Sequence, residues 1–265
     1  MIPRFLARIR PHIHPVQALG RLARIFLWAA AAFHACLFFL ILAACAVLAR
    51  WNPPATSLMA YRSLTSSGQV QPLRYVPLRQ IPRSVQLMFI RLEDRKFYSH
   101  VGIDPAAIRD AYRVNKAIGY TFYGGSTIPQ QLARTLFLTP RKTYFRKYVE
   151  ALIAVEMDLL LNKERILELY HNYIEWGKGV YGIGAASVAS YGRPSVGLSV
   201  DEYRRLVTIL PNPLRFNTDT FARSRQMAER YRYLVEHFPD PTELQDPAPS
   251  EEAAPSNDGD DQPGT

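Results

Sequence analysis

Residues 85–104, VQLMFIRLEDRKFYSHVGID, place a glutamate directly behind an apolar run, with no turn signal between them. The apolar residues recur at helical spacing and predict one buried stripe, Val85, Met88, Phe89 and Leu92. Glu93 follows Phe89 by four residues, so it lies at the edge of this stripe. A carboxylate at the rim of an apolar cleft is a good proton acceptor, because it is partly desolvated. A solvated glutamate paired with Arg91 or Lys96 explains the same residues, and the stretch alone leaves both interpretations open.

The charge of the chain is uneven. Residues 1–24 hold five arginines and no acidic residue, whereas residues 239–265 hold eight acidic residues and no basic one. Without that tail the formal net charge rises from +9 to +17, because eight negative charges are removed. A basic body indicates anionic partners such as phospholipid headgroups, a phosphorylated substrate or nucleic acid. The tail is rich in proline and poor in apolar residues, which predicts disorder over 239–265.

Residues 25–49 carry no formal charge and predict one transmembrane helix, since about 20 apolar residues suffice to cross a bilayer. The arginines before it predict that residues 1–24 are cytoplasmic and that residues 50 onward lie on the far side of the membrane. This placement argues against nucleic acid as a partner. Both cysteines, Cys36 and Cys45, fall inside the span, so the remainder of the chain has no disulfide and no thiolate metal site.

The rest of the chain predicts one mostly α-helical domain. Residues 50–83 contain several prolines and few periodic apolar positions, which is typical of a linker and an irregular approach segment. Residues 84–238 show helical periodicity, as in one stripe of Phe145, Tyr148, Val149, Leu152, Val155 and Leu159 and another of Ile166, Tyr170 and Tyr173. A capping box from Ser199 to Glu202 predicts a later helix that ends at Pro211, and a last helix is predicted over 221–238.

A second polar stretch, residues 123–138, reads YGGSTIPQQLARTLFL. Two glycines before Ser126 and Thr127 offer a turn whose amides and hydroxyls can hold an oxyanion. Gln130 and Gln131 then begin a helix. Residues 111–149 contain no acidic residue but seven bases, namely Arg113, Lys116, Arg134, Arg141, Lys142, Arg146 and Lys147. Such a field suits a diphosphate, and it equally suits a basic surface facing anionic lipid headgroups.

Glu150 ends the acid-free stretch. Arg146 and Lys147 precede it by four and three residues, so all three share one helix face. Two neighbouring cations favour an ionised carboxylate, which suits an electrostatic or metal-binding role better than that of a general acid. An ordinary helical ion pair is the alternative.

Five motifs occur in order along the chain: EDRKFYSHVG, GGSTIPQQ, RKYVE, KERILELYHN and LPNPLRF. Their order and spacing resemble the motif series of the peptidoglycan glycosyltransferases, a domain shared with bifunctional penicillin-binding proteins, and most closely the monofunctional membrane-anchored kind. The resemblance runs from about residue 87 to residue 216. It implies a lysozyme-like, mostly α-helical glycosyltransferase domain with two lobes at 84–238, held by one transmembrane helix in the inner membrane, with the domain in the periplasm.

The resemblance implies a reaction. The 4-hydroxyl of an acceptor sugar attacks the anomeric carbon of lipid II or of the growing glycan chain, forming a β-1,4 bond with inversion and releasing polyprenyl diphosphate. Glu93 matches the catalytic base. Glu150 matches the second glutamate, with a divalent cation, magnesium or manganese, implied there and no organic cofactor. Further implied partners are membrane lipids, facing the apolar patch 117–123, and proteins of cell-wall synthesis and division.

The remaining motif residues carry implied supporting roles. Those that match substrate-binding positions are Ser126, Thr127, Gln130, Gln131, Arg134, Arg146, Lys147, Lys163 and Asn172, with Glu168 beside them in the fourth motif. Those expected to support the loop that follows Glu93 are Asp94, Phe97, His100 and Gly102.

Some residues depart from the family pattern. Pro129, Thr135 and His171 replace a small polar residue, an asparagine and a leucine, and Tyr203, Arg204 and Arg205 stand in the fifth motif where small or apolar residues are usual. Bulky cations on a packed helix cost stability unless they reach solvent. The departures leave both glutamates intact, so they put rate and substrate grip in question more than reaction type.

Two other functions fit the same sequence. A lysozyme-like hydrolase would cleave glycan on this fold, but it needs a second carboxyl across the sugar, and the basic field suits a diphosphate better. A non-catalytic membrane scaffold would explain the fifth-motif departures but not the two retained glutamates.

Overall fold

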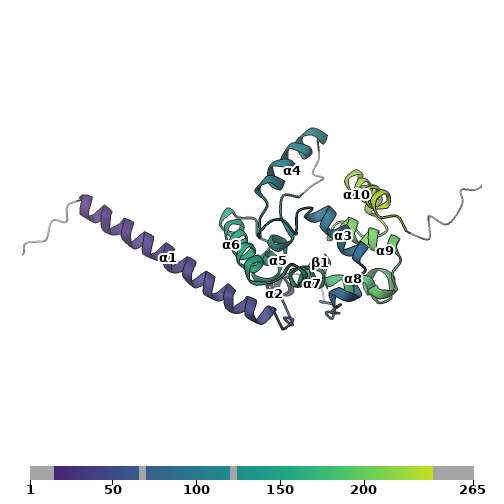
Figure 1. The fold of residues 1–265 in the computed structure, drawn as a ribbon, viewed down its shortest axis with the longest axis horizontal. Helices are drawn as coiled ribbons and strands as arrows, with labels where there is room; N and C mark the ends of the chain where they lie inside the picture. The colour runs from purple at the N-terminus through teal and green to yellow at the C-terminus, as the bar shows by residue number, and fades with distance from the viewer. Residues whose placement is uncertain (1–14, 66–69, 120–123, 241–265) are drawn as a thin grey trace, which may run out of the picture.

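The computed structural model describes residues 15–65, 70–119 and 124–240. Most of the predicted tail, part of the patch 117–123 and most of the segment 1–24 lie outside these residues. The described chain is mostly α-helical (Figure 1). Its helices are α1 Pro15–Leu48, α2 Ser57–Thr65, α3 Arg83–Glu93, α4 Pro105–Ile118, α5 Ile128–Phe137, α6 Tyr144–Leu160, α7 Lys163–Tyr173, α8 Gly182–Tyr191, α9 Val200–Ile209 and α10 Arg225–His237. Short 3-10 turns are Leu78–Gln80, Ser195–Gly197 and Phe221–Arg223, and β1 Glu175–Gly177 pairs antiparallel with β2 Val180–Tyr181.

Helix α1 extends away from the helical body in Figure 1. Its segment Ala18–Leu48 is long and apolar enough to cross a membrane. The helix starts nearly three turns before the predicted span and includes Arg21 and Arg24, because arginine and leucine are good helix formers and only Gly20 opposes them. Its last turns pack on α6, where Ile41 and Cys45 are buried.

Helix α2 corrects the prediction of an irregular segment over 50–83. Leu58 and Met59 are buried and α2 packs against α5, so this segment belongs to the domain core. The Oγ1 atom of Thr56 accepts a hydrogen bond from the backbone N–H of Met59 at 3.2 Å, which satisfies an otherwise unpaired donor in the first turn. The helix is nine residues long, and so short an apolar pattern does not stand out in the sequence.

The core forms where α5 packs against α6 and α7. The predicted stripe of α3 is confirmed, since Val85, Met88, Phe89 and Leu92 are all buried. The predicted stripe of α7 is also confirmed, with Ile166, Tyr170 and Tyr173 fully buried. The capping box from Ser199 to Glu202 begins α9 as predicted.

The helix predicted from the stripe between Phe145 and Leu159 is confirmed as α6, but most of that stripe does not face the core. Phe145, Tyr148 and Leu159 are 65%, 45% and 69% exposed, and the buried face consists of Val149, Glu150, Ile153, Ala154 and Met157. The exposed face meets α1 instead. The ring of Phe145 lies 6.0 Å from that of Phe33, and the Tyr148 hydroxyl donates to His34 Nε2 at 2.5 Å. Helix α6 thus has two apolar faces, and periodicity does not say which one faces the core.

His171, one of the departures, lies fully buried on α7. Its Nδ1–H donates to the Leu167 carbonyl at 2.6 Å, and its ring stands edge-on to Phe89, 4.3 Å between centroids. Burial lowers the pKa of His171 from 6.5 to about 4. Between pH 6.5 and pH 4 this imidazole is protonated in the unfolded chain but not in the folded one. The folded state therefore has its full stability above about pH 6.5 and loses stability as the pH falls toward 4.

We therefore expect a His171→Leu variant to lose less stability in acid than the wild type. The difference between the two proteins should grow from pH 7 to pH 4 by up to about 3 kcal/mol, at 1.36 kcal/mol per unit of pKa shift. Thermal unfolding of the detergent-solubilised chain across this range measures it. His237→Leu, at an exposed position of α10, is the control and should keep the wild-type acid sensitivity. Identical profiles for wild type and His171→Leu would contradict the prediction.

Candidate active site

Glu93 is the last residue of α3, and its side chain is only 10% exposed. Its Oε1 accepts a hydrogen bond from Arg230 Nη2 at 2.6 Å, and its Oε2 accepts one from Gln131 Nε2 at 3.1 Å. The carboxylate is therefore held by α10 and α5, rather than by Arg91 or Lys96 as the solvated alternative required. Both oxygens are fixed, which orients the group as a proton acceptor at a stated place.

Tyr170 orients the amide that holds Glu93. Its hydroxyl donates to Gln131 Oε1 at 3.1 Å, which leaves the Gln131 amide nitrogen facing the carboxylate. Burial, reinforced by the Glu93 charge, raises the pKa of Tyr170 well above its usual value. The phenol consequently stays neutral and keeps its proton for this hydrogen bond.

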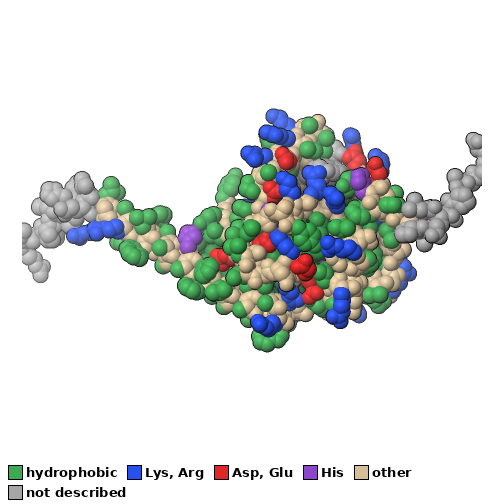
Figure 2. All heavy atoms as spheres, viewed as in Figure 1, with side chains coloured by type: hydrophobic (Ala, Val, Ile, Leu, Met, Phe, Trp, Pro, Cys, Tyr) green, Lys and Arg blue, Asp and Glu red, His purple; other side chains and the backbone are tan. Residues whose placement is uncertain are grey.

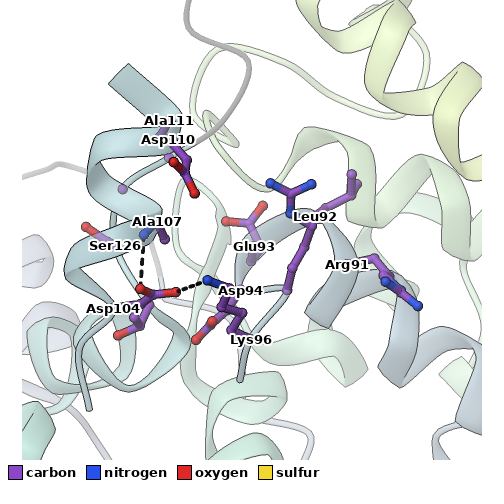
Figure 3. Close-up of a pocket in the computed structure, with 14 residues that line it drawn as sticks. Arg91, Leu92, Glu93, Asp94, Lys96, Asp104, Ala107, Asp110, Ala111 and Ser126 are labelled. Carbon is purple, nitrogen blue, oxygen red and sulfur yellow. Dashed lines mark hydrogen bonds and ion pairs between the residues drawn. The ribbon is translucent and has the colours of Figure 1, made fainter. Parts of the chain in front are cut away.

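Glu93 opens into a cavity of about 110 Å³ between the end of α3 and α4. Figure 3 shows Glu93 pointing into this space, while Arg91 points away from it. Asp104 and Asp110 line the cavity on the side of α4. Ser126, a residue of the second motif, also lines it. This cavity is large enough for part of a sugar but not for a whole lipid-linked substrate.

A second, larger hollow of about 330 Å³ lies beyond Gln131. Its lining includes four cations, Arg62, Arg134, Lys142 and Arg146. Glu175 neutralises Arg62 through two hydrogen bonds of 2.9 Å. Arg146 pairs with Glu150, whereas no salt bridge to a described carboxylate is found for Arg134 or Lys142, so the hollow keeps the net positive field that a diphosphate requires.

Glu150 lies on the buried face of α6 with 1% of its side chain exposed. Arg146 and Lys147 each donate to one of its oxygens, as the sequence spacing predicted. The Nζ atom of Lys147 also donates to Ser126 Oγ at 2.8 Å, which joins the second motif to α6. Glu150 therefore positions two cations beside the glycine turn.

Thr127 and Gln130 form a capping box at the start of α5. The backbone N–H of Gln130 donates to Thr127 Oγ1 at 3.3 Å, and the backbone N–H of Thr127 donates to Gln130 Oε1 at 3.1 Å. Both side chains are buried. The structure thus places these two expected substrate-binding residues at the helix start, where they orient Gln131 and Arg134.

Two buried carboxylates, Asp94 and Asp158, accept hydrogen bonds that hold the loop after Glu93. Asp94 accepts hydrogen bonds from His100 Nε2 at 2.8 Å and from the backbone N–H of Ile128 at 2.9 Å. Asp158 accepts from the Gly102 backbone N–H at 2.5 Å and from Lys163 Nζ at 2.6 Å. The supporting arrangement expected around Asp94, His100 and Gly102 is present, and Asp158 completes it.

Gly102 and Phe97 fit this loop tightly. Gly102 has φ +69°, and a Cβ there would lie 2.5 Å from Val155 Cα, so only glycine fits. Phe97 is fully buried, with Lys163 Nζ 4.8 Å from its ring centroid. Lys163 also donates to the His100 carbonyl at 2.8 Å, so it ties the loop together instead of lining the site.

The other fourth-motif residues also hold the fold. Asn172 is fully buried and bonds both the backbone N–H and the carbonyl of Val76, at 2.7 and 2.8 Å. Glu168 accepts from the backbone N–H of Leu78 at 2.9 Å and from Arg165 Nη1 at 2.6 Å. These contacts anchor the segment before α3, and the structure does not bring Asn172 to Glu93.

The departures from the family pattern find partners in the interior. Pro129 occupies the first turn of α5, where its missing N–H costs nothing, and Thr135 donates to the Gln131 carbonyl at 2.9 Å. Tyr203 is buried and donates to the Ser195 carbonyl at 2.5 Å. Arg204 is buried as well and does not reach solvent, the condition under which a stability cost was expected. It donates to the Phe238 carbonyl from Nε and Nη2, at 3.1 and 2.7 Å.

A divalent cation at Glu150 stays a prediction. Both Glu150 oxygens bind cationic side chains, and within the described ranges no three His, Cys, Asp or Glu side chains are grouped so that they could hold a metal ion. These residues by themselves do not fit a protein-held metal.

Comparison with known proteins shows which family the domain resembles. A transglycosylase family model matches residues 61–238, so the match begins inside α2. The chain is 40% identical over 186 residues to a biosynthetic peptidoglycan transglycosylase of Azoarcus sp. (strain BH72), covering 68% of this chain and 80% of that one. It is 39% identical over 175 residues to one of Dechloromonas aromatica (strain RCB), covering 64% and 76%.

A longer protein matches too. Penicillin-binding protein 1A of Aquifex aeolicus (strain VF5) is 40% identical over 173 residues, which are 64% of this chain and 24% of that protein. The likeness there is to one part of a larger chain. Because the family model covers more than half of the chain, from the second half of α2 to residue 238 and including both glutamates, the chain belongs to the transglycosylase family.

Proposed function

We propose that this transglycosylase polymerises peptidoglycan glycan chains from lipid II, on the lysozyme-like, mostly α-helical fold of its family. The observation that carries the proposal is Glu93, a nearly buried carboxylate held by Arg230 and Gln131 between a small cavity and a cationic hollow. A proton acceptor beside a diphosphate-binding field is what a glycosyl transfer with a diphosphate leaving group needs.

The chemistry follows from this arrangement. Glu93 accepts the proton of the acceptor's 4-hydroxyl, and the oxygen attacks the anomeric carbon of the donor from the side opposite the diphosphate. The bond from the anomeric carbon to the diphosphate oxygen breaks as the new β-1,4 bond forms. The leaving polyprenyl diphosphate keeps the electron pair, and Arg134 and Arg146 stabilise the developing charge.

The hydrolase alternative does not fit the second glutamate. A lysozyme-type reaction needs two carboxyls free to face the sugar, about 5 Å apart in retaining enzymes. Glu93 lines the small cavity, whereas the Glu150 side chain is 1% exposed, pairs with Arg146 and Lys147, and does not line that cavity. The scaffold alternative rested on the fifth-motif departures. Tyr203 and Arg204 have hydrogen-bond partners inside the domain, so these departures are accommodated by the fold and do not by themselves favour a loss of activity.

The direct test is polymerisation of labelled lipid II by the full chain in detergent. We expect glycan chains that muramidase cleaves, with one polyprenyl diphosphate released for each bond formed. A folded protein, as judged by cooperative thermal unfolding, that makes no chains and releases no diphosphate would overturn the proposal.

The membrane placement extends this proposal. Helix α1 is consistent with a single-pass anchor, and we place residues 1–24 in the cytoplasm and the domain in the periplasm, following the arginines before the span. Exposed apolar side chains on α4 and α6, such as Tyr112 and Tyr144, suit contact with membrane lipids. Figure 2 shows basic side chains gathered over α4, where anionic headgroups would meet them.

A reporter enzyme that is active only in the periplasm, fused after residue 265, checks the orientation; an inactive fusion of normal abundance would reverse it. Partners among cell-wall synthesis and division proteins stay a prediction.

A further inference from the structure

We propose that α10 positions the base: Arg230 fixes the Glu93 carboxylate, and Arg204 and Arg205 of α9 fix α10. The inference rests on the proposed function, in which Glu93 is the proton acceptor. No sequence motif pointed to Arg230, which lies 137 residues after Glu93.

Arg230 occupies a position that an apolar residue would normally fill. The buried face of α10 consists of Met227, Arg230 and Leu234, at helical spacing. Burying a guanidinium in such a stripe is costly unless a carboxylate compensates it. The compensating group is Glu93, 2.6 Å from Arg230 Nη2, with the two side chains only 2% and 10% exposed. An apolar side chain at this position would pack without a desolvation cost, so stability alone does not explain the arginine. Its carboxylate partner is the proposed base, and we therefore assign Arg230 a role in the site.

The C-terminal end of α10 is held by Arg204. Phe238 is the C-cap of the helix, and its carbonyl accepts two hydrogen bonds from the buried Arg204 guanidinium. A cation at this end also interacts favourably with the helix dipole. The departure that the sequence marked as a stability cost therefore fixes the helix that carries Arg230.

The middle of α10 is held by a second group on α9. The Tyr231 hydroxyl donates to Asp201 Oδ1, and Arg205 Nε donates to Asp201 Oδ2 at 2.7 Å. The Arg205 guanidinium also lies over the Tyr231 ring, 5.6 Å from its centroid. Tyr231 is adjacent to Arg230 in the chain, so these contacts limit rotation and sliding of the helix at the point where it meets Glu93.

Kinetics of Arg230 variants test the first link. We expect Arg230→Met to lower kcat about 100-fold while KM for lipid II changes less than about 2-fold, because the loss is in the orientation of the base and not in diphosphate binding. Arg230→Lys keeps the charge and should recover at least about 10-fold of that loss. Arg232→Met, an exposed arginine on the same helix, is the matched control and should keep the wild-type rate. Rates within 3-fold of wild type for Arg230→Met would overturn the inference, as would a fall equally large in Arg230→Lys.

Melting temperatures give a second readout that does not need catalysis. Arg230→Met leaves Glu93 buried without a counterion, whereas the double variant Glu93→Gln/Arg230→Met leaves neither charge. We expect the double variant to melt at a higher temperature than Arg230→Met alone. A double variant that melts lower, by the sum of the two single changes, would show that the residues do not act together. If the wild type makes no glycan, the proposed function fails, and this comparison still decides the Arg230–Glu93 link.

Arg204→Met tests the second link. We expect faster amide hydrogen exchange over 225–238 and a fall in kcat of about 5-fold with KM unchanged, because α10 is held less firmly. Normal exchange with a normal rate would remove Arg204 from the proposal.

Discussion

A Glu93→Gln variant is expected to lose at least about 1000-fold in the rate of lipid II polymerisation, the upper part of the range for a general base. The amide has the size of the carboxylate, and its oxygen still accepts the hydrogen bond from Arg230. It does not accept a proton, so the acceptor hydroxyl remains a weak nucleophile. The loss should appear in kcat, since the cations of the larger hollow are untouched.

The measurement is the initial rate of diphosphate release from labelled lipid II, with thermal unfolding of each variant recorded beside it. Glu236→Gln makes the same change of charge at an exposed position of α10 and serves as the control. A Glu93→Gln protein that is folded and retains more than about a tenth of the wild-type rate would remove Glu93 from its role.

Local signals in the sequence were sufficient for much of this site. The stripe before Glu93 and the Ser199 to Glu202 capping box depend on neighbours within four residues, and both are present as predicted. The grouping of Arg146, Lys147 and Glu150 is also set by helical spacing alone. Such features were predictable because they depend on residues within one or two helical turns of each other.

Long-range contacts were not predictable in this way. The Arg230 partner of Glu93 is 137 residues away, and an arginine in the last helix carries no mark of a distant carboxylate. The fourth motif shows a different limit of sequence patterns. Lys163 and Asn172 match substrate-binding positions by pattern, yet one ties the loop after Glu93 and the other bonds Val76. A pattern of polar residues identifies positions that matter without saying whether a substrate or the backbone is the partner.

The sequence did not show which face of α6 packs on the core, for a related reason. Phe145 and Tyr148 belong to an apolar stripe as regular as that of a core helix, but their neighbours are Phe33 and His34 of α1. Apolar periodicity reports avoidance of water, and burial against protein and exposure to lipid satisfy it equally. Helix α2 was missed for a different reason, because its two buried residues make too short a pattern to stand out among the prolines.

The second large effect is expected at Glu150. A Glu150→Gln variant should lose about 100-fold in kcat/KM, within the range found when one preorganised electrostatic contact is removed. The neutral amide leaves Arg146 and Lys147 without the carboxylate that holds them, and Lys147 is also the residue that joins Ser126 to α6. Two uncompensated cations beside a buried amide should move toward solvent, which spreads the field that stabilises the leaving diphosphate. Unlike the change at Glu93, this one should raise KM as well as lower kcat, because the cations hold the diphosphate of the bound substrate and hold it more strongly once the leaving charge develops in the transition state.

The control at this site also addresses the metal. Glu156→Gln changes a glutamate of the same helix whose pKa is raised by burial, and it should leave the rate unchanged because Glu156 makes no contact with the cation pair. Rates of both variants and of the wild type are measured with and without a chelator. If a divalent cation acts through Glu150, chelation slows the wild type and Glu156→Gln but has no further effect on Glu150→Gln. If chelation changes none of the three, the carboxylate works through Arg146 and Lys147 alone, as its hydrogen bonds indicate. A Glu150→Gln protein with wild-type kcat/KM would contradict both accounts, because each requires the negative charge.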